Sequence, residues 1–123
     1  MYLDSGRLEE AEKELILSKD SLPNTITYPQ FRATLAVIYS KMGQLMHRKN
    51  RNSGIPNTTA DLYHRLSLDL IQKTSPSEDL HSHVYILYEY AKYLSTIGDT
   101  TGKSSSYLTQ AYDLLSRGDN LSE

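Results

Sequence analysis

Apolar residues recur at helical spacing along most of the chain. The first apolar stripe consists of Leu8, Ala11, Leu15 and Leu22. Their spacings of three, four and seven residues place them on one face of a helix. Pro23 is expected to end that helix, because proline lacks the backbone N–H and its ring hinders the preceding turn.

The same periodicity predicts four further helices. They are expected from near Pro29 to Gly43, from about Thr58 to Lys73, from Ser77 to just before Gly98, and from about Ser104 to Ser116. Their buried stripes are predicted to be Leu35, Ala36, Tyr39 and Met42; Leu62, Tyr63, Leu66 and Leu70; Val84, Leu87, Tyr90, Ala91 and Leu94; and Leu108, Ala111 and Leu115. Strand signals are weak, so the pattern predicts an all-α fold of five helices, each antiparallel to the next.

One segment breaks this pattern. Residues 44–59 are rich in turn formers and are predicted to be a basic loop that follows a helix stop at Gly43. Its cationic residues are His47, Arg48, Lys49 and Arg51, and no acidic residue lies between Gln44 and Ala60. Such a loop is most often simply solvated; RNA, a phospholipid head group or an acidic peptide are the alternative ligands.

Composition narrows the function classes. The chain has 123 residues, enough for one domain, and carries a net charge of −2 and no cysteine. The charge argues against a general nucleic-acid-coating protein, and the lack of thiols excludes disulfides, thiol catalysis and zinc–thiolate sites. No secretory signal or membrane-spanning run is recognised, so we expect a cytoplasmic protein, with the nucleus as the alternative.

Three segments share one pattern, in which a helix ends at a glycine and a second helix follows with small residues at packing positions. They read Tyr2-x3-Gly6-Arg7-Leu8-x2-Ala11, Leu35-Ala36-x2-Tyr39-x3-Gly43, and Leu87-x2-Tyr90-Ala91-x2-Leu94-x3-Gly98. On these residues the chain resembles the tetratricopeptide repeat family. The glycine spacings are 37 and 55 residues, whereas a regular repeat has about 34, which places an insertion at about 44–59.

The resemblance implies a short right-handed superhelix of two to three irregular repeats, in one domain over residues 1–123 that looks like part of a longer array. It implies a non-catalytic scaffold, without a cofactor, that holds a peptide or helix of a partner protein in a concave groove. The resemblance places the groove of the second repeat at Gln30, Ala33, Thr34, Val37 and Lys41. It places the groove of the third repeat at Tyr85, Tyr88, Glu89 and Lys92. This set does not match the carboxylate clamp of the chaperone adaptors, so an extended or helical segment with apolar side chains is the expected ligand.

Two motifs suggest chemistry that their context does not support. Gly98 to Ser104 resembles a phosphate-binding loop, but only three residues separate its glycines and a helix precedes it, so a helix-to-helix turn is expected. His81 and His83 point in different directions on a helix and are expected at a solvated helix start rather than on a metal. His47 and His64 are isolated in the sequence.

Four tyrosines fall within nine residues at positions 85, 88, 90 and 93. Tyr90 aligns with the core of the repeat, which leaves Tyr85 and Tyr88 for the groove or for packing against a neighbouring repeat. The competing role is structural: the segment would self-associate, or pack on other repeats, through the open ends of an array. Nucleic-acid binding through the basic loop is a third and weaker alternative.

Overall fold

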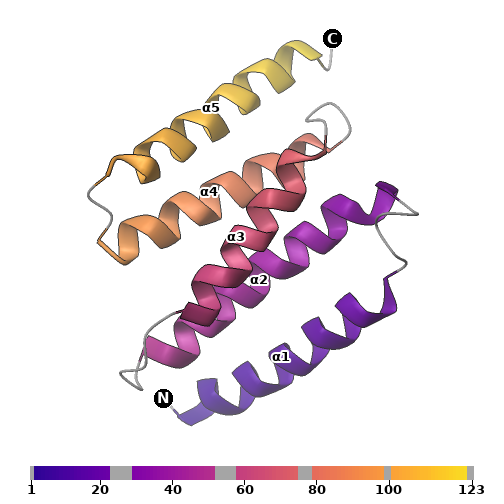
Figure 1. Cartoon of the computed structure of the whole chain (residues 1–123), viewed down its shortest axis with the longest axis vertical. Coiled ribbons are helices and arrows are strands. Elements are labelled where there is room, and N and C mark those ends of the chain that lie inside the picture. The colour runs from indigo at the N-terminus through magenta and orange to yellow at the C-terminus, as the bar shows by residue number, and fades with distance from the viewer. Residues whose placement is uncertain (1, 23–28, 52–57, 75–78, 99–100, 122–123) are drawn as a thin grey trace.

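The computed structural model describes residues 2–22, 29–51, 58–74, 79–98 and 101–121. Its elements are α1 (Tyr2–Ser21), a 3₁₀ turn η1 (Pro29–Phe31), α2 (Arg32–Arg51), α3 (Thr58–Gln72), α4 (Leu80–Thr96) and α5 (Lys103–Leu121) (Figure 1). No strand occurs within these ranges. The predicted all-α fold of five helices is therefore confirmed.

Each helix packs against the next helix in the chain, and α2 also contacts α4. In Figure 1, α1, α2, α4 and α5 lie side by side, with α3 crossing in front of α2, and consecutive helices run antiparallel. This arrangement exposes the two edges, since α1 contacts only α2 and α5 contacts only α4 among the described elements. None of the described helices is long and apolar enough to cross a membrane.

The core lies where α2, α3 and α4 meet. Ala36 and Ala91 are buried, and both belong to stripes predicted from the sequence. Tyr90 is buried as predicted, and its ring lies 5.1 Å from that of Tyr107 on α5. Small residues at these positions let helix backbones approach closely, and the tyrosines fill the space between them.

The predicted helix stop at Gly43 is wrong, because α2 continues to Arg51. The basic residues 44–51 are therefore helical rather than a loop, and residues 52–57 of the predicted insertion lie outside the described part of the chain. Gly43 is buried, and a Cβ atom there would lie 2.7 Å from Cδ2 of His64 on α3. The glycine provides room for a neighbouring ring rather than ending the helix.

The predicted turn at Gly6 is also wrong, because α1 is continuous from Tyr2 to Ser21. Of the three glycines used to measure a repeat length, only Gly98 follows the end of a helix, with a φ of 79° that suits glycine. The spacings of the other two glycines therefore do not measure repeat lengths. What remains of the pattern is the buried alanines and Tyr90, not the glycines.

The predicted stripe of α3 is displaced. Leu62 is 54% exposed and Leu66 is also exposed, whereas the helix buries Ala60, His64, Ser67, Leu68 and Ile71. Small and polar residues face inward because α3 lies close to α2: Oγ of Ser67 donates a 2.6 Å hydrogen bond to the carbonyl oxygen of Ala36. On α5, Leu115 is likewise exposed instead of buried.

Candidate partner-binding surface

The predicted groove positions Thr34, Val37 and Lys41 form a line along one side of α2, and Gln30 precedes them in η1. Gln30, Thr34 and Lys41 are exposed, and Val37 is half-buried against the core. The spacing of three or four residues keeps Thr34, Val37 and Lys41 on one helical face. Ala33, also predicted as a groove position, is buried in the core and is not accessible to a partner. The accessible part of the predicted surface on α2 is therefore Thr34 and Lys41, with Val37 as its inner edge.

The line extends further along α2 than the sequence predicted. Because α2 passes through Gly43, the same spacing leads from Lys41 to Gln44 and Arg48. Gln44 was missed, and Arg48 was assigned to a loop. Continuing the spacing beyond Lys41 would have found both residues, but the expected stop at Gly43 concealed this signal.

A pocket of about 330 Å³ lies between α1 and α2. From α1 it is lined by Ala11, Glu14, Leu15 and Ser18, and from α2 by Lys41, Gln44, Leu45 and Arg48. Its walls therefore combine apolar side chains, two cations and one carboxylate. No local pattern in the sequence predicts this pocket, because it depends on how α1 lies against α2.

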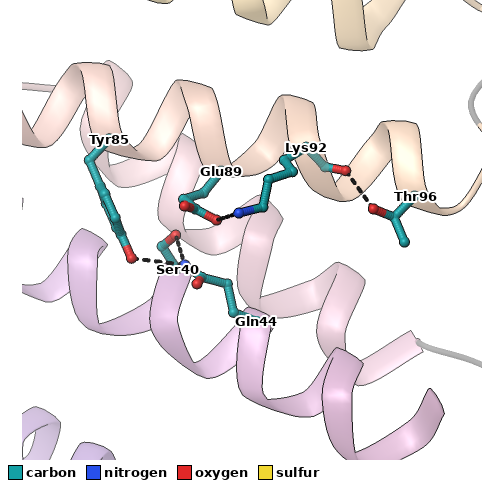
Figure 2. Close-up of polar contacts among 6 residues, drawn as sticks. All are labelled: Ser40, Gln44, Tyr85, Glu89, Lys92 and Thr96. Carbon is teal, nitrogen blue, oxygen red and sulfur yellow. Dashed lines mark hydrogen bonds and ion pairs between the residues drawn. The ribbon is translucent and has the colours of Figure 1, made fainter.

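Tyr85 connects α4 to α2 rather than facing solvent. Its hydroxyl accepts a 2.9 Å hydrogen bond from Nε2 of Gln44, and the same nitrogen lies 3.3 Å from Oγ of Ser40 (Figure 2). The side chain is half-buried and packs against the core. Of the two tyrosines assigned to the groove, Tyr85 joins two helices, and Tyr88 is the accessible one.

The other groove residues of α4 form a small charged group. Nζ of Lys92 lies 3.8 Å from Oε2 of Glu89 and 5.7 Å from the ring centre of Tyr88. The side chain of Glu89 is only 11% exposed, whereas Tyr88 is 45% exposed. Figure 2 shows Glu89 and Lys92 along α4 above α2, with Thr96 one turn further. Tyr88 and Lys92 therefore present an amphipathic, cation-capped surface to a ligand.

The basic residues predicted in a loop are divided by the helix. His47 is half-buried, with its ring 5.5 Å from that of Tyr93 in an edge-on arrangement, and Arg48 is exposed at the pocket. Lys49 and Arg51 belong to α2, but their side chains lie outside the described residues. Of the two described members of this run, only Arg48 is exposed, and the ring of His47 packs against α4.

The buried histidines have structural roles. His64 stacks on Tyr93 at 4.4 Å, and burial, followed by the nearby His47, lowers its pKa from 6.5 to about 4. His83 is buried too, with Nε2 2.6 Å from the carbonyl oxygen of Thr74, so the expected solvated position is wrong for this residue. No group of three or more metal-ligating side chains occurs within the described ranges.

The glycine-rich segment before α5 forms a helix connection as far as it is described. Gly98 and Gly102 both have positive φ, α5 begins at Lys103, and residues 99–100 lie outside the described part. Oγ of Ser104 donates a 2.7 Å hydrogen bond to the carbonyl oxygen of Ala91 on α4. This bond ties the start of α5 to the preceding helix.

Comparison with known proteins gives no relative from which a function could be transferred. No family model matches the chain, and no match was found among curated proteins or among solved structures. Any functional conclusion must therefore come from the surface itself.

Proposed function

We propose that this chain is a non-catalytic protein–protein interaction scaffold that binds a peptide or helix of a partner along the side of α2 that faces α1. The observation that carries the proposal is the 330 Å³ pocket between α1 and α2, which lies on the same helical line as the exposed groove positions. Pockets of this size, with apolar walls and a few polar groups, are suited to holding one or two side chains of a ligand.

The proposal places a partner segment across two neighbouring surfaces. One surface consists of Thr34, Lys41 and Arg48 on α2, and the other of Tyr88 and Lys92 on α4. Gln44 lies between them, since it lines the pocket and also bonds to Tyr85. The two most buried histidines, His64 and His83, are occupied by packing and hydrogen bonding, so no catalytic step is assigned to them.

The resemblance to tetratricopeptide repeats is part of this proposal. Its support is that α2 with α3 and α4 with α5 form two antiparallel pairs, joined by contacts from α2 and α3 to α4. In such an array the first helix of each pair lines the groove, which agrees with placing the ligand on α2 and α4. The proposed setting is the cytoplasm or the nucleus.

A selection of displayed random peptides against the immobilised full chain tests the proposal. We expect enriched peptides that bind the Tyr88→Ala variant more weakly than the wild type by about 2 kcal/mol of binding free energy, because the substitution removes the contact area of an exposed anchor tyrosine. Tyr112→Ala on α5 is the matched control, since Tyr112 is also exposed but lies on a helix that contacts only α4. Recovery of no enriched peptide would contradict the proposed function.

The exposed edges favour a second candidate, self-association. Leu17 on α1 and both Tyr112 and Leu115 on α5 are exposed, on the two helices that contact one neighbour each. Pairing of these edges would bury apolar surface on both. Sedimentation should then show a dimer that depends on concentration and is lost in Leu17→Lys, whereas a monomer at all concentrations favours the peptide scaffold alone.

A further inference from the structure

Two cations at the pocket lack the ion pairs that several other exposed cations in the described residues form. Arg65, Lys92 and Arg117 each lie within 4 Å of a carboxylate on their own helix, and Lys73, just after α3, lies 3.0 Å from Asp69. Lys41 and Arg48 are exposed, line the pocket and form no ion pair with any described residue. Their positive charges are therefore available to a ligand.

The helix holds these two cations at a defined separation. Lys41 and Arg48 are seven residues apart on α2. This corresponds to two helical turns, or about 10 Å along the axis, on the same face. Gln44 lies between them, and its side chain is fixed by bonds to Tyr85 and Ser40. The pocket is thus bordered by two cations from positions about 10 Å apart along the α2 axis, with a fixed polar group between those positions.

The other walls favour a polypeptide over a nucleic acid. Leu15 and Leu45 provide apolar contact area, and among the described residues no aromatic side chain on which a base could stack lines the pocket. Glu14 also lines it, and α1 carries further acidic residues at positions 9, 10 and 12. These carboxylates would repel a continuous polyphosphate chain, whereas separate acidic side chains can approach the cations from the α2 side.

We propose that the pocket binds an acidic segment of a partner protein, with one carboxylate paired to Lys41 and another to Arg48. An apolar side chain of the same segment lies between them, on Leu15 and Leu45. In a polyproline II segment the two acids are three residues apart on the same face, because three residues make one turn and span about 9 Å. This inference rests on the proposed function and specifies the chemistry of its ligand.

The peptide selection, repeated on charge variants, tests this inference. Peptides selected on the wild-type chain should be enriched in Asp or Glu pairs about three residues apart. Their affinity should fall about tenfold or more in Lys41→Glu/Arg48→Glu, where two attractions become repulsions. Lys103→Glu/Arg117→Glu on α5 changes the net charge equally and should leave the affinity unchanged.

Glu14→Gln provides an independent test of the same pocket. Removing the one carboxylate that lines it should strengthen binding of the acidic peptides severalfold, while the affinity of their Gln-substituted counterparts stays the same. A general loss of folding cannot produce a gain in affinity, so this variant separates the pocket from structural damage.

The outcomes distinguish the inference from the proposed function. Enriched peptides without acidic pairs, whose binding is insensitive to the Lys41 and Arg48 substitutions, would overturn the inference and leave the scaffold in place. No enriched peptides would overturn both. Saturable binding of a labelled single-stranded polyuridine that is lost in the same double variant would also overturn the inference, by assigning the cations to phosphate.

Discussion

The two sides of α2 are built in opposite ways. Toward α3 the helices are in close contact: Ser67 bonds to the backbone at Ala36, and the ring of His64 occupies the space of a side chain at Gly43. Toward α1 the contact is loose and leaves a pocket of about 330 Å³. Small residues permit the close approach on one side, whereas longer charged residues keep the other side open.

The comparison indicates which side carries stability and which side is available for binding. On the closely packed side toward α3, a larger side chain should lower the free energy of unfolding strongly. On the side toward α1, the open pocket can accommodate a larger side chain. Substitutions matched between the two sides therefore test the account.

The largest contrast is between two buried alanines, Ala36 and Ala91, and Ala11 at the pocket. Ala36→Trp should prevent folding, because Ala36 is completely buried and the surrounding helices cannot accept an indole ring. Ala91→Trp should have the same effect in α4. Ala11→Trp should leave the thermal unfolding transition nearly unchanged, because Ala11 is half-buried and borders the pocket. Equal stability of all three variants, measured by circular dichroism, would refute the difference between the two sides.

The next contrast is between two tyrosines of α4. Tyr90→Ala should lower the free energy of unfolding by about 3 kcal/mol, because the buried ring contacts Tyr107 and leaves a cavity. Tyr88→Ala should change it by about 0.5 kcal/mol or less, since Tyr88 is exposed. Urea titration of both variants measures the difference, and a reversed order would mean that the orientation of α4 is wrong.

Acid should weaken the side of α2 that contacts α3. The pKa of His64 is about 4 in the folded chain and 6.5 in the unfolded chain. Between pH 6.5 and 4 the unfolded chain therefore binds a proton on this ring that the folded chain does not bind. The stabilising effect of the neutral ring is complete above pH 6.5, and about 3 kcal/mol of it is lost as the pH falls to 4. NMR titration of the ring checks the pKa, and His64→Gln should show a smaller decrease in stability with acid.

A smaller effect is expected at Gly43, and its sign depends on His64. Gly43→Ala should destabilise the chain by about 1 kcal/mol, since the clash with the His64 ring outweighs the gain of about 1 kcal/mol in helix propensity. In the background of His64→Ala the same substitution should become neutral or stabilising. If it has the same effect in both backgrounds, the two residues are not in contact.

The sequence was sufficient to predict the helices and part of the core. Unbroken helical periodicity identified all five helices, and the stripe of α4 was placed well, with Leu87, Tyr90 and Ala91 buried. These predictions succeeded because the residues that determine them lie within a few turns of one another. Thr34 and Lys41, which the resemblance assigned to the groove, are exposed.

Features that depend on distant partners could not be predicted in this way. Gly43 resembles a helix stop, and its role is evident only because His64, 21 residues later, lies against it. The leucines of α3 suggested a buried stripe, but the close approach to α2 selects Ala60 and Ser67 instead. The pocket follows from the position of α1 beside α2, which no local pattern specifies.

Mapping a selected peptide onto the chain by NMR tests most directly whether the open side of α2 is the binding side. During titration, the account predicts that backbone amide shifts will be concentrated at residues 11–18 of α1 and 41–48 of α2, with smaller shifts near Tyr88 and Lys92. Amides around the exposed Leu62 and Leu66 of α3 should not move. Shifts concentrated on α3, with the pocket residues unaffected, would contradict the account.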